Sequence, residues 1–274
     1  MAIDLSSLSR GRRLRAPISI FYGPEGCGKT TFGAGAPKPI LARAEDGIGA
    51  LATPRWPADV EDGGTGTFQT FEEVCEFLAA LLTDPHDYQS LVFDSLSALE
   101  KLIWAYVCRQ HNVDSIEEVL KGYGKGYTEA VYAWQTFYGW LEALRNQRGM
   151  AIVLIGHSTV QKFTDPQSSE YDQYALRLHK KAAEYLFEKM DIVGFLNWRT
   201  FTEKEEQGFN KTRVRATNQR RVLYLSKQPA FYAKQRENLP NELQIQDDPT
   251  NPTCGWQVFI DAWNAATTSP AAAE

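Results

Sequence analysis

Residues 23–30 read Gly-Pro-Glu-Gly-Cys-Gly-Lys-Thr and come directly after the apolar run Ile-Ser-Ile-Phe-Tyr at 18–22. This is the phosphate-binding pattern G-x-x-x-x-G-K-[ST], placed between an apolar strand and a helix as its chemistry requires. The glycines let successive backbone N–H groups turn inward around phosphate oxygens, and the following helix presents its positive N-terminal end. The sequence therefore predicts a site for a nucleoside triphosphate.

The loop assigns a role to each of its polar groups. Lys29 is expected to bridge the β- and γ-phosphates, and the Thr30 hydroxyl to be a ligand of Mg²⁺, so ATP and Mg²⁺ are the expected cofactors. Asp94 ends the apolar strand Ser-Leu-Val-Phe-Asp at 90–94 and is the expected second acidic group at the metal. A carboxylate that caps the next helix is the alternative for Asp94. The predicted nucleotide-binding residues are Gly23, Pro24, Glu25, Gly26, Cys27, Gly28, Lys29, Thr30 and Thr31.

The general base is predicted to lie away from Asp94. Many ATPases place a water-activating Glu beside that Asp, but the neighbour here is Ser95. Glu45 ends the predicted strand 39–44, and in an open parallel sheet the ligand lies just outside such carboxyl ends. Glu45 is therefore the candidate base. Asp46 is its competitor, and an ordinary surface turn is the alternative.

Apolar strands at 17–22, 39–44, 90–94 and 151–155 alternate with helices at about 71–82, 95–110 and 128–148. This alternation predicts an α/β fold with a mainly parallel sheet flanked by helices. After a polar loop at 159–175 and a helix at 178–189, runs at 191–200, 212–217 and 221–226 predict added antiparallel hairpins. The expected organisation is a basic N-terminal arm (1–16), an ATPase core (17–240) and an acidic C-terminal extension with a disordered end (241–274).

Composition places the chain among ordinary globular proteins, with 43% hydrophobic and 23% charged residues. No apolar run approaches the roughly 18 residues that cross a bilayer. No membrane partner is therefore expected. The four cysteines are far apart and form no Cys-x-x-Cys motif, which favours a reduced, cytoplasmic setting.

Charge is strongly segregated along the second half of the chain. Residues 207–236 contain eight basic and no acidic residues, whereas 237–274 contain six acidic and no basic ones. Such segregation favours polyanion binding by the basic stretch. It also raises the hypothesis that the acidic segment competes with DNA. The predicted DNA contacts are Lys162 and Phe163 in the 159–175 loop, with Lys211, Arg213, Arg215, Arg220 and Arg221 in the basic stretch.

Several segments resemble the RecA family of recombinases. These are the Leu-Ala-Arg-Ala-Glu that ends at Glu45, the Leu-Val-Phe-Asp-Ser-Leu-Ser-Ala-Leu at 91–99, and Ala-Lys-Gln-Arg at 233–236. The resemblance implies that His157, after strand 151–155, senses the γ-phosphate and relays its presence to DNA-binding loops. It also implies that Lys234 and Arg236 reach the ATP of a neighbouring subunit as trans-acting fingers.

Taken in order along the chain, the phosphate-binding loop and these segments make residues 17–240 most similar to the compact phage RecA-like single-strand annealing proteins of the Sak group. That resemblance implies a RecA-like P-loop ATPase that binds single-stranded DNA and promotes annealing or pairing. Its expected partners are other copies of the chain in a filament or ring, and a single-strand-binding protein, in the cytoplasm of a bacterial host. A DnaB-like helicase or helicase loader and a KaiC-like ATP switch are the alternatives.

Overall fold

The computed structural model describes residues 14–47, 49, 51–164, 169–207, 211–245, 248, 250–251 and 253–268. Between residues 200 and 219 it describes only the backbone of two strands. The sequence expectations for the basic arm before residue 14 and for the chain end after residue 268 lie outside the described residues.

One sheet runs through the molecule, in the strand order β10-β8-β7-β1-β5-β4-β2-β3, with β6 paired to β5 and β9 to β7. Strands β7, β1, β5, β4, β2 and β3 are parallel, and the pairs that involve β6, β8, β9 and β10 are antiparallel. The predicted α/β class, a mainly parallel sheet with antiparallel strands added late in the chain, is confirmed. The strands are β1 (Ile18–Gly23), β2 (Pro39–Arg43), β3 (Arg55–Trp56), β4 (Ser90–Asp94), β5 (Ala151–Phe163), β6 (Tyr171–Leu176), β7 (Ile192–Gln207), β8 (Lys211–Tyr224), β9 (Lys234–Gln235) and β10 (Glu242–Gln244).

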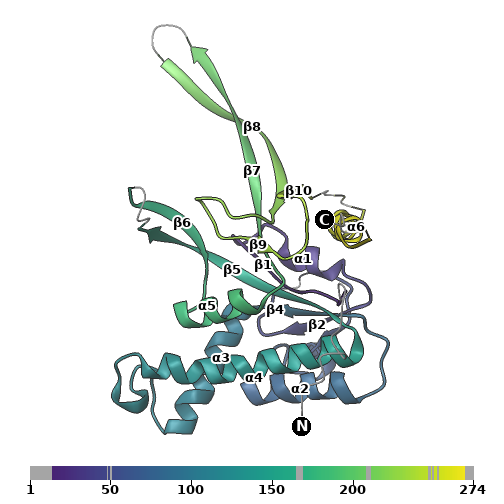
Figure 1. Cartoon of the computed structure of the whole chain (residues 1–274), viewed down its shortest axis with the longest axis vertical. Helices are drawn as coiled ribbons and strands as arrows, with labels where there is room; N and C mark the ends of the chain where they lie inside the picture. The colour runs from purple at the N-terminus through teal and green to yellow at the C-terminus, as the bar shows by residue number, and fades with distance from the viewer. Residues whose placement is uncertain are drawn as a thin grey trace, which may run out of the picture.

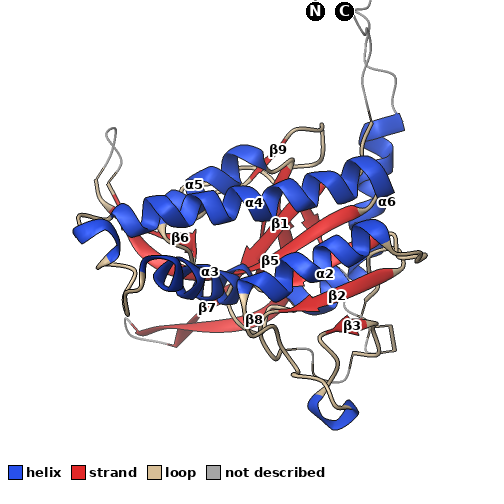
Figure 2. Ribbon diagram, turned by 90° about the horizontal axis from the view of Figure 1, so that it is seen from below, coloured by secondary structure: helices blue, strands red, loops and turns tan. Residues whose placement is uncertain are grey.

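Helices cover both faces of the sheet (Figures 1 and 2). One layer contains α2, α3, α4 and α5, and the other contains α1 and α6. The helices are α1 (Lys29–Ala34), α2 (Phe71–Thr83), α3 (Leu96–His111), α4 (Lys125–Arg148), α5 (Lys180–Lys189) and α6 (Gly255–Thr268), with short 3-10 turns at Val60–Asp62 and Val119–Lys121.

The central strand β1 is buried on both faces because a layer of helices covers each of them. Ile18, Ile20 and Tyr22 point into the core beneath α2 to α5, and Phe21 points into the core beneath α1 and α6. A parallel strand in this position is therefore an unbroken apolar run rather than an alternating one. This burial fixes the position at which β1 ends and the phosphate-binding loop begins.

Side-chain hydrogen bonds from N-cap residues fix where two helices begin. The Thr70 side chain accepts a hydrogen bond from the Glu73 N–H and caps α2, and Ser95 accepts from the Ala98 N–H and caps α3. Both use the preferred N-cap chemistry. Ser95, the residue directly after Asp94, is therefore the N-cap of α3.

The expectation of a polar loop at 159–175 is wrong. Strand β5 continues past Ile155 to Phe163 and turns back as β6, with Ser158 opposite Leu176 and Phe163 opposite Tyr171. Tyr174 anchors the hairpin, because its N–H donates to the Ala230 carbonyl and its ring packs on Phe195. The polar composition predicted solvent exposure correctly, but an exposed two-stranded ribbon also has polar residues.

The strands expected at 191–200, 212–217 and 221–226 form one long hairpin of β7 and β8. Figure 1 shows it projecting from the sheet as an arm. The pairing is continuous from Phe195 opposite Tyr224 to Gln207 opposite Lys211, with one irregularity after Phe201.

The segment from residue 241, expected to be an appended acidic extension, packs onto the core where the structure describes it. Strand β10 pairs with β8 at the sheet edge. Helix α6 buries Trp256 and Phe259, whose rings lie 5.1 Å from Phe32 and 5.4 Å from Phe21, respectively. Deleting residues 241–274 would expose this core, so deletion is unsuitable as a test of competition between the acidic segment and DNA.

Phe259→Ala should lower the free energy of unfolding by about 3–5 kcal/mol, because the Phe259 side chain is 1% exposed and its removal leaves a cavity. Asn264→Ala, on the exposed side of the same helix, should change it by no more than about 0.5 kcal/mol. Urea unfolding of both variants measures the difference. Equal stability of the two variants would show that α6 is not part of the cooperative core.

Candidate nucleotide site

The site lies at the carboxyl ends of the parallel strands β1, β2 and β4. Gly23 at the end of β1 is in register with His157 on β5, and Asp94 at the end of β4 is in register with Arg43 on β2. Glu45 follows β2 by two residues, and its N–H donates to the Asp94 carbonyl. Residues from distant parts of the sequence therefore meet because the carboxyl ends of parallel strands share one edge.

The phosphate-binding loop is closed around its own lysine. The Lys29 ammonium is buried and donates to the carbonyls of Gly23 at 3.1 Å and Pro24 at 2.7 Å. Gly26 and Gly28 have φ of 73° and 80°, in the left-handed region that glycine adopts without strain. A Cβ on Gly28 would also lie only 2.1 Å from a guanidinium nitrogen of Arg221. The positive φ therefore accounts for glycine at position 28, and the Arg221 side chain occupies the space beside it.

Thr30 and Asp94 bring two oxygen atoms together at the base of the loop. The Thr30 hydroxyl donates to Asp94 Oδ2 at 2.5 Å. Burial raises the pKa of Asp94, and the nearby Glu45 carboxylate adds to this effect, while the hydrogen bond from Thr30 opposes it. A buried carboxylate with a raised pKa gains from a nearby cation, and Mg²⁺ is typically held by one or two protein oxygens plus substrate phosphates. The pair fits the expected metal.

Glu45 is hydrogen-bonded to His157, with Glu45 Oε1 and His157 Nε2 2.5 Å apart. Burial opposes ionisation of Glu45, but hydrogen bonds from His157 and Ser95 and the charges of His157 and Arg177 outweigh it and lower the pKa. Glu45 is therefore ionised at neutral pH, as a base must be. The competing Asp46 is exposed.

These groups line one cavity of about 360 Å³. It brings together most of the predicted loop residues with the predicted base, sensor and metal ligand. Gly23, Pro24 and Cys27 of the loop, and Asp46, are not among the lining residues. The cavity is lined by Glu25, Gly26, Gly28, Lys29, Thr30, Thr31, Glu45, Gly47, Asp94 and His157.

Lys234 and Arg236 lie at the other end of the sheet, beside the amino ends of the parallel strands. Lys234 pairs with Val193 at the start of β7, and β7 runs parallel to β1 from that end. The Lys234 ammonium donates to the Glu188 carbonyl at 3.3 Å, and the Arg236 guanidinium donates to the same carbonyl at 2.7 Å. Neither residue lines the ATP cavity of its own chain, so contact of either residue with ATP requires a second copy.

The two predicted DNA contacts Lys162 and Phe163 lie on the projecting β5–β6 hairpin. The Lys162 side chain is 74% exposed and forms an ion pair with Glu170 at 3.5 Å. Phe163 packs on Tyr171, with ring centroids 5.5 Å apart. Tyr171 is a neighbour that the sequence reasoning missed, because only the strand register places it opposite Phe163.

The basic stretch includes strand β8, which pairs with β7. The backbone register places Glu203 opposite Arg215 and Glu205 opposite Arg213 in the β7–β8 hairpin. The charge of the strand was visible in the sequence, but its partner strand was not. The side chains of Lys211, Arg213 and Arg215 lie outside the described residues.

Two arginines of this stretch have other partners. Arg221, predicted to contact DNA, is 5% exposed and lies against Gly28, so its side chain is buried in this structure. Side chains alternate between the two faces of a strand, and Arg221 falls on the inner face next to Leu223. Arg220 is exposed and donates to Gln244 on β10 at 3.1 Å.

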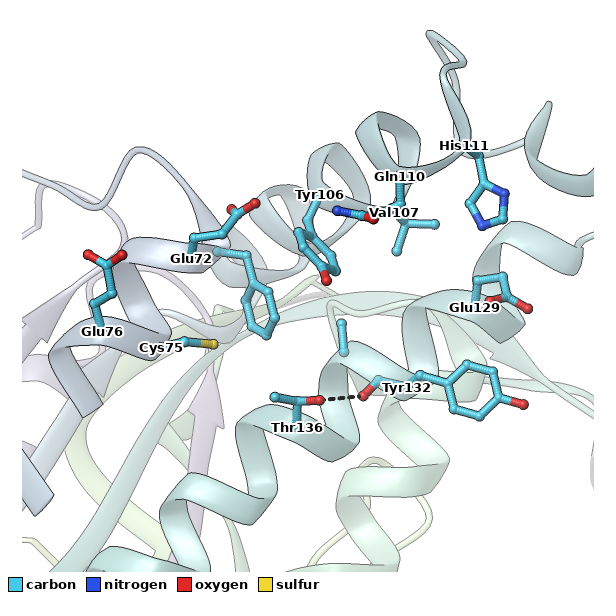
Figure 3. A pocket seen from close by; sticks show the side chains of 12 residues that line it. Glu72, Cys75, Glu76, Tyr106, Val107, Gln110, His111, Glu129, Tyr132 and Thr136 are labelled. Carbon is cyan, nitrogen blue, oxygen red and sulfur yellow. Dashed lines mark hydrogen bonds between the residues drawn. The ribbon is translucent and has the colours of Figure 1, made fainter. Parts of the chain in front are cut away.

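Two larger cavities lie away from this site. One of about 510 Å³ lies between α2, α3 and α4, with Tyr106, Glu129 and Tyr132 among its lining residues (Figure 3). The other, of about 850 Å³, lies beside β3 and α2. Neither is lined by a residue of the phosphate-binding loop. The volume of a cavity therefore does not identify the nucleotide site in this molecule.

The fold and the cavity together define a P-loop ATPase. The chain belongs to the AAA domain family (AAA_24), whose model matches residues 16–237. It is also 24% identical over 168 residues to the SPbeta prophage-derived uncharacterized protein YorG of Bacillus subtilis (strain 168). That match covers 59% of this chain and 48% of the relative, so the chain aligns with about half of the relative's length.

Among solved structures, the crystal structure of the RadB recombinase matches with a TM-score of 0.44 and 13% identity. The match covers 85% of this chain and 89% of that one. Separately, none of the helices in the described part of the chain is both long and apolar enough to span a membrane.

Glu45→Gln should retain ATP binding and lower the hydrolysis rate about 100-fold or more, because the amide cannot take a proton from water. Asp46→Asn is the matched control, since Asp46 is the adjacent carboxylate and does not line the cavity. Steady-state phosphate release and a nucleotide titration measure the two quantities. Normal hydrolysis by Glu45→Gln would overturn the assignment of the base.

Proposed function

We propose that this protein is a RecA-like ATPase that binds single-stranded DNA and promotes annealing or pairing, as in the Sak group. One observation carries the proposal. Strand β5 holds His157 in the ATP cavity and continues without a break to Lys162 and Phe163 in an exposed hairpin. A single rigid strand thus joins the γ-phosphate end of the site to a surface with residues suited to DNA.

The chain's own residues divide the hydrolytic work. Lys29 and the loop amides hold the phosphates, and Thr30 with Asp94 holds Mg²⁺, which supplies charge neutralisation when bound. Glu45 takes a proton from the attacking water. His157, at 2.5 Å from Glu45, orients that carboxylate and is placed to respond to the γ-phosphate.

DNA binding is supported by the described side chains of the β5–β6 hairpin. The hairpin combines an exposed Lys162 with the aromatic pair Phe163 and Tyr171. Such a pair offers a stacking surface to unpaired bases, and the lysine neutralises phosphate.

Assembly into a filament or ring is supported by the two separated halves of the site. Lys234 and Arg236 are held together by the Glu188 carbonyl at the sheet edge opposite the ATP cavity. Head-to-tail contact between copies brings one edge against the other and generates a ring or an open filament. In that arrangement the pair neutralises charge on the neighbour's ATP.

Annealing of two complementary oligonucleotides, with and without ATP, tests the function directly. Phe163→Ala should weaken binding of a single strand about tenfold through lost stacking. Lys162→Ala should reduce the salt dependence of binding by about one counterion. Tyr132→Ala and Lys101→Ala are matched controls, since they remove an exposed aromatic and an exposed lysine from the helical layer.

The outcomes separate the proposed function from its rivals. Unwinding of a forked duplex without annealing would indicate a helicase. ATP hydrolysis without any salt-sensitive DNA binding would indicate an ATP switch that does not act on DNA. Equal DNA binding by Phe163→Ala and by the Tyr132→Ala control would contradict the hairpin's role.

A further inference from the structure

Arg177 is a cation at the rim of the ATP cavity that sequence patterns did not reveal. It directly follows β6, at the base of the β5–β6 hairpin. Its guanidinium forms an ion pair with Glu25 of the phosphate-binding loop, with 3.5 Å between NH1 and Oε1. Arg177 therefore contacts a residue of the phosphate-binding loop that lines the cavity.

The backbone around Arg177 is fixed to elements that converge on the site. The Arg177 N–H donates to the His157 carbonyl at 2.8 Å, and the Ser97 hydroxyl donates to the Arg177 carbonyl at 3.0 Å. Two residues further on, the His179 N–H donates to the buried Glu100 carboxylate at 2.8 Å. Ser97 and Glu100 belong to α3, which begins directly after Asp94 and Ser95.

The side chain, in contrast, is free to change partner. The Arg177 side chain is 48% exposed and that of Glu25 is 77% exposed, so solvent weakens the ion pair that joins them. A phosphate offers arginine a bidentate, doubly charged partner that an exposed carboxylate does not match. The position thus combines a fixed backbone with an exchangeable guanidinium beside the loop.

We propose that Arg177 binds the γ-phosphate of ATP in its own chain, leaves Glu25 when it does so, and thereby couples the nucleotide to the β5–β6 hairpin. The proposal rests on ATP binding at the phosphate-binding loop and does not require DNA annealing. In ADP the γ-phosphate is missing, so Arg177 stays with Glu25. Strand β6 ends at Leu176, directly before Arg177, so the base of the hairpin follows the position of Arg177. The hairpin base then has one arrangement with ATP bound and another with ADP bound.

Titration of the full chain with Mg-ADP and with the Mg²⁺ complex of a non-hydrolysable ATP analogue tests this without DNA. Arg177→Ala should weaken binding of the analogue about tenfold or more and leave ADP affinity unchanged, because one charge-assisted contact is lost. Arg177→Lys should retain part of the preference. Arg109→Ala is the matched control, since it removes an equally exposed arginine from an ion pair with Glu72 on the helical layer.

Glu25→Gln separates γ-phosphate binding from a purely structural ion pair. If Arg177 serves only to anchor the loop, Glu25→Gln and Arg177→Ala have the same effect on both nucleotides. On our proposal Glu25→Gln frees Arg177 and raises the preference for the analogue over ADP, opposite to Arg177→Ala. The same direction of change in both variants would overturn the proposal.

Hydrogen exchange of the β5–β6 amides reports the coupling itself. In the wild type the analogue should slow exchange in this hairpin more than ADP does, and in Arg177→Ala the two nucleotides should give equal exchange. A nucleotide-dependent difference that survives in Arg177→Ala would contradict the coupling. Failure of DNA annealing, with these results as expected, would count against the proposed function and leave the role of Arg177 intact.

Discussion

The shared edge of β1, β4 and β5 is the constraint on which the rest of the site depends. Because β1 and β4 end beside the stretch Ile155–His157 of β5, Gly23, Asp94 and His157 meet although they are far apart in sequence. The Thr30–Asp94 contact of 2.5 Å and the Glu45–His157 contact of 2.5 Å both follow from that alignment. Burial of β1 between two helical layers holds its end in place, since a shift in strand register would disrupt the packing of its side chains in both cores.

Two hairpins, β5–β6 and β7–β8, extend beyond the core, and they connect the nucleotide site to the surface. Strand β5 leads from His157 to the tip region at Phe163, and β6 returns to Arg177 beside the phosphate-binding loop. Strand β8 places Arg221 against Gly28 from the other side. The nucleotide loop therefore contacts the bases of both arms, whereas Lys234 and Arg236 lie at the far edge of the sheet.

Local pattern predicted the phosphate-binding loop, the parallel core and the position of Glu45, because each rests on a short apolar run with a strand-end residue. It did not predict the β5–β6 hairpin, the neighbours Tyr171 and Arg177, or the burial of Arg221. These depend on strand pairing between segments that carry no mutual signal in one sequence. The packing of Trp256 and Phe259 on Phe21 was missed for a similar reason, since acidic composition concealed an amphipathic helix.

We propose that the ATP site is completed by a second copy of the chain. Glu45→Gln damages the half of the site around the loop, and Arg236→Ala damages the half at the opposite edge. Each variant alone should hydrolyse ATP poorly. A mixture of the two should hydrolyse ATP faster than the sum of the separate rates, because mixed assemblies contain interfaces with both halves intact. A mixture no faster than that sum, or an Arg236→Ala variant as active as the wild type, would contradict a shared site.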